Sequence, residues 1–109
     1  MKTAYTVTAI LISLLGALHI GFTYLNFDRF DMDAVWFLGS GVAIVLAGFL
    51  NIALTRSSDS VIRGLAVGTN LIFLLGFTGA TLMLPQPQVY FGALLFLIAA
   101  LFSMLWRER

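Results

Sequence analysis

Residues 34–54 read AVWFLGSGVAIVLAGFLNIAL, a run of 21 residues without a charged side chain. A helix of about 20 residues crosses the hydrocarbon core of a bilayer, so this run predicts a transmembrane helix. Three more apolar runs of similar length are separated from it and from each other by short polar segments. The four predicted helices cover about residues 4–25, 34–54, 61–84 and 89–106. We therefore predict an all-α fold, an integral membrane four-helix bundle that forms a single transmembrane domain over residues 1–109.

The composition excludes several other classes of protein. Of the 109 residues, 61% are hydrophobic and 10% are charged, and the mean hydropathy is +1.02. A soluble domain has about a quarter charged residues. Six basic side chains against five acidic ones leave no basic face for nucleic acid. The absence of cysteine excludes disulfides and thiolate metal sites, and a single histidine excludes any one-chain site that needs two imidazoles.

The distribution of basic residues predicts the orientation. With four spans, both termini and residues 55–60 lie on one side of the membrane. The basic side chains on that side are Lys2, Arg56, Arg63, Arg107 and Arg109. The other side has Arg29 alone, beside three aspartates. Because short cytoplasmic loops are enriched in Lys and Arg, we expect both termini to be cytoplasmic.

The polar aromatic residues agree with these spans. Every Tyr and Trp lies within a few residues of a predicted span end: they are Tyr5, Tyr24, Trp36, Tyr90 and Trp106. Such rings favour the membrane interface, where their polar atoms can contact water. We expect all five there.

Two short sequence motifs occur twice in the chain, which suggests a duplicated helical hairpin. Residues 14–16 and 74–76 both read Leu-Leu-Gly, and residues 35–37 (Val-Trp-Phe) resemble residues 89–91 (Val-Tyr-Phe). Both pairs keep the same order and the same direction across the membrane. This pattern is typical of two parallel helical hairpins related by a pseudo-two-fold axis along the membrane normal.

Small residues at four-residue spacing predict close helix packing. The first predicted helix has Ala9, Ser13, Ala17 and Gly21, and the second has Gly39, Ala43 and Ala47, with Gly41 and Gly48 seven residues apart on a neighbouring row. Such ridges let backbones approach within a membrane, either inside one chain or across a homodimer interface. We expect packing within the chain, and we keep a dimer as the alternative.

A polar layer is expected in the outer half of the bundle. Counting from the span ends places His19, Ser40 and Thr78 at similar depth, with Trp36 just above them. Polar groups inside a span are candidate functional residues, so these four are our candidate ligand-binding or proton-sensitive site. His19 has three interpretations: a hydrogen bond to Ser40, Thr78 or a backbone carbonyl that ties helices together, proton coupling or ligand binding, and haem or metal ligation with a second copy.

A second polar layer is expected in the inner half, from Thr8, Asn51, Asn70 and Ser103. An unpaired amide is unfavourable in hydrocarbon, so we expect a mutual hydrogen bond between Asn51 and Asn70.

One part of the chain resembles a known group of proteins. The pattern is Leu18-His19-Ile20-Gly21 near the end of the first helix, a short polar loop, then Trp36-Phe37 and a glycine-rich second helix. It resembles small, uncharacterised bacterial four-helix membrane proteins, mainly over residues 14–54. The resemblance implies a location in the bacterial inner membrane and no catalytic activity.

These observations favour a non-enzymatic, multi-pass inner-membrane protein, either an accessory bundle or one that binds a small ligand or lipid in its outer half. The alternative is a minimal proton-sensitive transporter or channel that acts as a homo-oligomer. The spans have no deep carboxylate, Lys, Arg or Cys for acid–base or nucleophilic chemistry, so we do not expect an enzyme. We expect no cofactor and no metal. The expected partners are membrane lipids and either a second copy or a partner membrane protein, and not nucleic acid.

Overall fold

The computed structural model describes residues 1–106 and contains four helices. They are α1 (Lys2–Asn26), α2 (Met32–Leu54), α3 (Ser60–Met83) and α4 (Pro87–Leu105). This confirms the predicted all-α four-helix bundle, with each helix within about two residues of its expected bounds. Arg107 and Arg109, which entered the prediction of orientation, lie outside the described residues.

Local sequence explains where the helices begin. The Asp31 carboxylate accepts a hydrogen bond from the backbone N–H of Ala34 at 3.0 Å and so caps α2. The Asp59 carboxylate accepts from the amides of Val61 and Ile62 and caps α3. Pro87 is the first residue of α4. The N–H of the first helical residue makes no hydrogen bond within the helix, so a proline fits this position.

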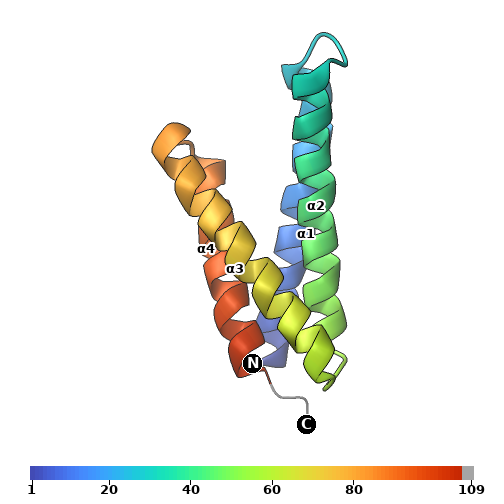
Figure 1. Ribbon diagram of the computed structural model, residues 1–109, viewed down its shortest axis with the longest axis vertical. Coiled ribbons are helices and arrows are strands. Elements are labelled where there is room, and N and C mark those ends of the chain that lie inside the picture. The colour runs from blue at the N-terminus through green and yellow to red at the C-terminus, as the bar shows by residue number, and fades with distance from the viewer. Residues whose placement is uncertain (107–109) are drawn as a thin grey trace.

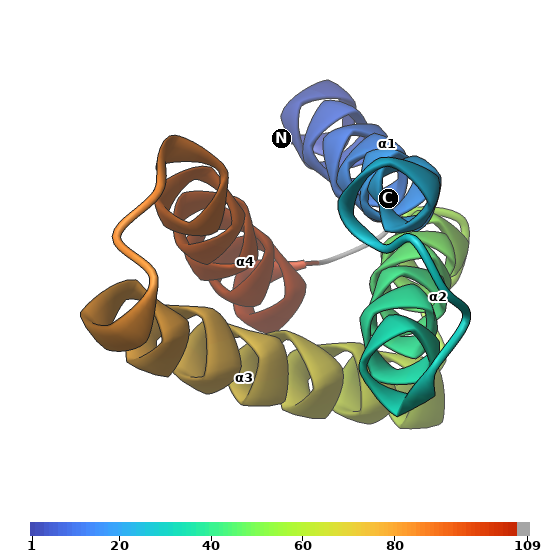
Figure 2. The ribbon, with the colours of Figure 1, turned by 90° about the horizontal axis from the view of Figure 1, so that it is seen from above.

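The helices form two antiparallel hairpins, α1–α2 and α3–α4 (Figure 1). The hairpins meet near the N-terminus, the α2–α3 loop and the end of α4, which we call the joined end. They diverge toward the α1–α2 and α3–α4 loops, which we call the open end. Seen from above, α3 runs from beside α4 at the open end to α2 at the joined end (Figure 2). The hairpins are therefore the packing units, while their origin by duplication stays a prediction.

Glycines allow α1 and α2 to touch along their backbones. A Cβ added at Gly16 would lie 2.6 Å from the backbone nitrogen of Val45, and one at Gly48 would lie 2.8 Å from that of Ser13. Real Cβ atoms essentially never approach so closely, so glycine is required at both positions. Close approach of this kind supplies the packing that lipid cannot drive by the hydrophobic effect.

The predicted small-residue ridges were partly wrong. Ala9 and Ala47 are buried, but Ala17, Gly21 and Gly39 are exposed. In α2 the contact follows the predicted second row, Gly41 and Gly48, and in α1 it lies at Gly16 and at Ser13 of the predicted ridge. Four-residue spacing alone does not fix the face that meets the partner, because small residues also occur on neighbouring rows, and a step of one residue turns the side chain by 100° around the helix.

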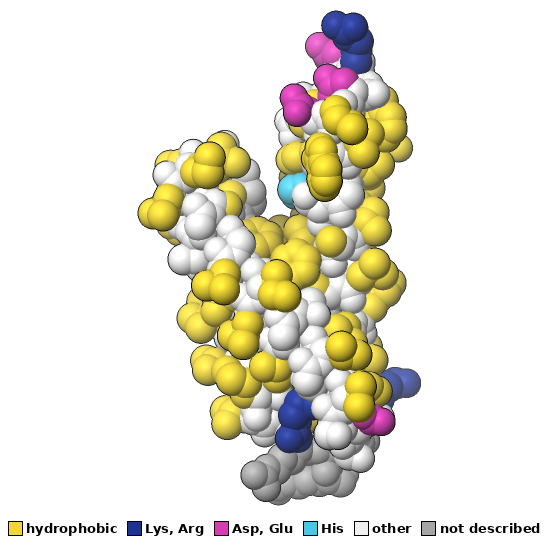
Figure 3. All heavy atoms as spheres, in the orientation of Figure 1, with side chains coloured by type: hydrophobic (Ala, Val, Ile, Leu, Met, Phe, Trp, Pro, Cys, Tyr) yellow, Lys and Arg dark blue, Asp and Glu magenta, His cyan; other side chains and the backbone are white. Residues whose placement is uncertain are grey.

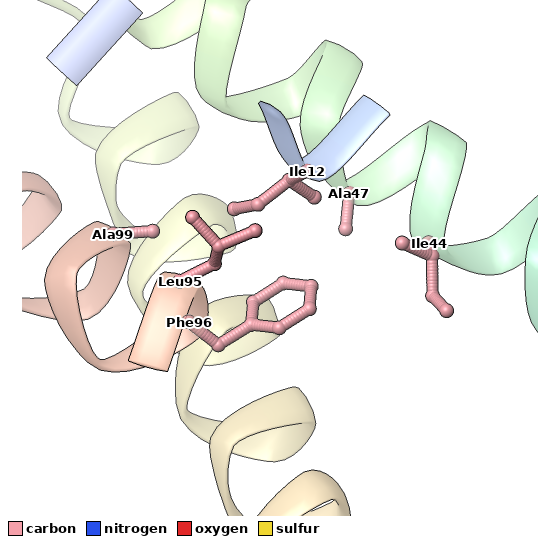
Figure 4. Close-up of a cluster of buried hydrophobic side chains, with 6 residues drawn as sticks. All are labelled: Ile12, Ile44, Ala47, Leu95, Phe96 and Ala99. Carbon is pink, nitrogen blue, oxygen red and sulfur yellow. The ribbon is translucent and has the colours of Figure 1, made fainter. Parts of the chain in front are cut away.

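An apolar core joins the hairpins at mid-height. Leu95, Phe96 and Ala99 of α4 pack against side chains of α1 and α2, namely Ile12, Ile44 and Ala47 (Figure 4). Phe96 also stacks on Phe73 of α3, with ring centroids 4.8 Å apart. All four helices therefore contribute to or contact this core.

The dimensions and surface fit a membrane protein. All four helices are long and apolar enough to cross a membrane. The structure extends 49 Å along its longest axis, compared with about 40–45 Å for a bilayer with its headgroups. On the face in Figure 3, apolar side chains cover the whole length and charged side chains gather at the two ends.

Two of the five aromatic residues expected at the membrane interface are instead buried at the joined end. Tyr5 is 0% exposed and Trp106 is 3% exposed, and the two rings pack edge to face with Phe102 beside them. The Trp106 indole N–H donates to the backbone oxygen of Ser57 at 3.1 Å. The expectation was wrong for this pair because their polar atoms find protein partners instead of water.

Candidate functional site

The divergence of the hairpins leaves a cleft at the open end, visible in Figure 3 beside the single histidine. Its α2–α3 side encloses about 360 Å³. That side is lined by His19, Ser40, Ala43, Ile44, Ile72, Phe73, Gly76, Phe77 and Ala80. The α1–α4 side encloses about 180 Å³ and shares His19, Ile44 and Phe77 with the first. We call both sides together the interhairpin cleft.

His19 is the most polar group deep in the cleft. Its ring stacks on Phe37, with centroids 3.8 Å apart and planes inclined by 15°. The Nε2 atom is buried and has no hydrogen-bond partner. A buried polar nitrogen without a partner is unfavourable by about 1–3 kcal/mol, so a polar group that reached it from the cleft would be stabilising.

The expected hydrogen bond from His19 to Ser40 or Thr78 is not formed. The Ser40 hydroxyl lies in the cleft wall but donates to the Trp36 carbonyl of its own helix, at 2.8 Å. Thr78 is exposed and is not part of the cleft lining. Of the predicted outer layer, the structure therefore brings together His19 and Ser40 and leaves Thr78 outside.

Trp36 also lies away from the cleft. Its side chain is 71% exposed on the outside of α2, in the position that suits an aromatic residue at a membrane interface. The predicted candidate site thus divides into two residues on the cleft and two on the outer surface.

Sequence reasoning missed the aromatic walls of the cleft. Phe37 and Phe77 each directly neighbour a predicted residue, Trp36 and Thr78. The predicted depth in the membrane was correct to within one residue, but a step of one residue turns the side chain by 100° around the helix. Asn26, Gln86 and Gln88, which lie in or beside the loops, add polar groups to the α1–α4 side of the cleft.

The inner polar layer forms a closed network with one side chain from each helix. Asn51 and Asn70 exchange two hydrogen bonds of 2.8 Å, one in each direction between Nδ2 and Oδ1. The Tyr5 hydroxyl donates to Asn51 Oδ1 at 2.5 Å, and Asn70 Nδ2 donates to Ser103 Oγ at 3.1 Å. This confirms the expected Asn51–Asn70 pair. Thr8 differs from expectation, because it bonds to the Ala4 carbonyl of its own helix.

Every polar hydrogen of this network has an acceptor. The second amide hydrogen of Asn51 goes to the Ala47 carbonyl at 2.8 Å, and the Ser103 hydroxyl donates to Ala100 at 3.0 Å. A fully satisfied, buried network offers no donor to a ligand, so this layer joins helices. Tyr5 was missed as a member, although Tyr5, Ala9 and Ile12 share the helical spacing of one buried face.

The described residues contain no group of three His, Cys, Asp or Glu side chains that could hold a metal ion. Comparison of the sequence and structure with protein-family models, curated proteins and solved structures finds no match.

Proposed function

We propose that this protein is a non-enzymatic, multi-pass protein of the bacterial inner membrane that binds a lipid-like molecule in the interhairpin cleft. The observation that carries the proposal is that His19, which lines an apolar cleft, has a buried Nε2 atom without a hydrogen-bond partner. Ligand sites combine apolar walls with a few polar groups that orient the ligand, and this cleft has that composition.

The position of the cleft supports an apolar ligand. His19 lies seven residues before Asn26, the end of α1, which places it about 10 Å below that end at 1.5 Å per residue. At this depth the cleft faces hydrocarbon, so an acyl or prenyl chain can enter from the side between α2 and α3. A carbonyl, carboxyl or hydroxyl group on the ligand would bond to the imidazole nitrogen.

The charge distribution supports cytoplasmic termini. Among residues 1–106, the helix bounds place Lys2, Arg56 and Arg63 at the joined end and Arg29 with the adjacent aspartates at the open end. By the positive-inside rule, the joined end faces the cytoplasm. The cleft then lies in the outer half of the membrane.

A proton-sensitive transporter is the second candidate function. It is favoured by one observation: His19, the single titratable side chain deep in a span, lies on the cleft. At the joined end, however, the Tyr5–Asn51–Asn70–Ser103 network connects all four helices. Transport through one copy requires this network to open, so a passage between copies suits this candidate better.

Filling the cleft tests the proposal. Gly76 lines it and has no atom within 4 Å of an added Cβ, so Gly76→Leu occupies the cleft without a backbone clash. Gly79→Leu is the matched control, because it makes the same change in open space on the same helix, outside the cleft lining. The probe is a long-chain fatty acid with a diazirine in its chain, photolysed in vesicles that contain the protein.

We expect the probe to label peptides of α2 and α3 in the parent and in Gly79→Leu, and to lose this labelling in Gly76→Leu. His19→Leu should weaken probe binding about fivefold, the equivalent of one hydrogen bond of about 1 kcal/mol. His19→Gln, which keeps a polar group at this position, should bind more tightly than His19→Leu. Equal labelling of Gly76→Leu and Gly79→Leu would refute the cleft as the binding site.

A further inference from the structure

A second groove lies at the joined end, on the outer side of the α1–α2 hairpin, far from the interhairpin cleft. It encloses about 420 Å³. It is lined by Lys2, Thr6, Ile10, Ile52, Thr55 and Arg56. The polar network described above does not include any of these side chains, and the proposed function does not use them.

Two positive charges meet at this groove from different helices. Lys2 is the first residue of α1, and Arg56 follows the end of α2, so they lie on opposite walls. No acidic side chain lines the groove. Asp59, the one acidic residue in the described part of this end, has its carboxylate bonded to the first amides of α3. The paired charges are therefore suited to an anion.

The groove changes from charged to apolar along the membrane normal. On α1, Lys2, Thr6 and Ile10 follow one another at four-residue intervals, which places them in one row. The row spans about 12 Å from the charged residue to the isoleucine at 1.5 Å per residue. On the facing wall, Ile52 of α2 lies deeper than Thr55 and Arg56, which follow the end of this helix, so the same gradient is repeated there.

This gradient matches one kind of molecule. A phospholipid presents a phosphate, then glycerol and ester oxygens, then acyl chains, in the same order and over a similar length. The Thr55 hydroxyl is buried and donates to the Ile52 carbonyl at 2.6 Å, so the half-buried Thr6 on the facing wall is the hydroxyl suited to the ester oxygens. Basic pockets between transmembrane helices recognise anionic headgroups in this way.

We propose that the groove binds an anionic phospholipid, with its phosphate between Lys2 and Arg56 and one acyl chain along Ile10 and Ile52. Arg63 belongs to the same end but has a different role, because its guanidinium donates to the Trp106 carbonyl at the end of α4. The site therefore depends on two particular cations and not on the total charge of this end.

Lipid titration of the full-length protein, followed by native mass spectrometry, tests this site. The probes are phosphatidylglycerol, phosphatidylcholine with the same acyl chains, and inorganic phosphate. Each basic side chain contributes roughly a fivefold factor to binding at an anionic surface, so K2Q/R56Q should weaken phosphatidylglycerol binding roughly 30-fold. Both side chains are exposed, so folding should be retained, which circular dichroism checks.

Two control variants separate a site from general charge. R29Q removes one positive charge at the open end and should leave binding unchanged, and K2R/R56K keeps both charges and should retain it. Phosphatidylcholine should bind the parent and K2Q/R56Q equally. Unchanged phosphatidylglycerol binding in K2Q/R56Q, or equal weakening by R29Q, would overturn the site. Binding of inorganic phosphate as tight as that of phosphatidylglycerol would overturn the lipid as its ligand.

Discussion

The Asn51–Asn70 pair makes a quantitative prediction about stability. Asn70→Leu removes three hydrogen bonds between helices, two to Asn51 and one to Ser103. Such bonds average about 0.6 kcal/mol in membrane proteins, which gives about 2 kcal/mol for the three. One amide hydrogen of Asn51 is also left without an acceptor, which adds about 1 kcal/mol. We expect Asn70→Leu to lower the free energy of unfolding by about 3 kcal/mol.

A double-mutant cycle isolates the pair itself. Asn51→Leu removes the same two mutual bonds and also the bond from Tyr5. Because the mutual bonds are lost in either single variant, Asn51→Leu/Asn70→Leu should be less destabilised than the sum of the singles. Two bonds of about 0.6–1.7 kcal/mol each give a coupling energy of about 1–3 kcal/mol.

The assay is reversible unfolding in mixed micelles with increasing dodecyl sulfate, followed by circular dichroism. Thr78→Val is the control, because Thr78 is exposed on the same helix, eight residues from Asn70. Its effect should be small, and in combination with Asn70→Leu it should be additive to within about 0.5 kcal/mol. An Asn51–Asn70 coupling no larger than that of this control would refute the hydrogen-bonded pair.

Two further predictions concern helix packing and topology. Gly48→Ala should lower the free energy of unfolding by about 1–3 kcal/mol, because the added methyl group meets the Ser13 backbone. Gly68→Ala places its methyl group in open space, so it should be neutral or raise the free energy of unfolding by up to about 1 kcal/mol. The same unfolding assay compares them, and equal effects would contradict the glycine contact of α1 with α2. The chain has no cysteine, so single cysteines can be introduced and labelled in cells that produce the protein. A membrane-impermeant maleimide should label Asp28→Cys in intact cells and Ser58→Cys only after permeabilisation. Labelling of both in intact cells would contradict the four spans.

The helices could be predicted from the sequence because hydropathy and length dominate in a membrane. An apolar run of about 20 residues has one favourable conformation in lipid, and the polar residues at its ends mark where it stops. The Asn51–Asn70 pair was predictable for a related reason. Their depths match, and an unpaired amide in hydrocarbon is unfavourable enough to require a partner.

The rotation of each helix could not be predicted in the same way. Lipid is as apolar as the core, so an exposed leucine and a buried one look alike in the sequence. In α3, Ala66 and Asn70 alone are fully buried, and apolar residues occur on every side. Nothing in the sequence therefore distinguishes Phe77, which lines the cleft, from Thr78, which does not. Tyr5 shows the same ambiguity, because a tyrosine near a span end suits either the interface or the bundle.

The two polar layers, predicted by the same count of depth, have opposite properties in the structure. Within residues 1–106, the side-chain hydrogen bonds between the hairpins are those of Asn51 with Asn70 and of Trp106 with the Ser57 carbonyl, all at the joined end. Toward the open end the hairpins meet through apolar contacts, and His19 Nε2 stays unpartnered. The open ends can therefore separate without breaking a side-chain hydrogen bond between the hairpins. Network variants should accordingly change stability, whereas Gly76→Leu should change ligand binding, so the two layers can be tested independently.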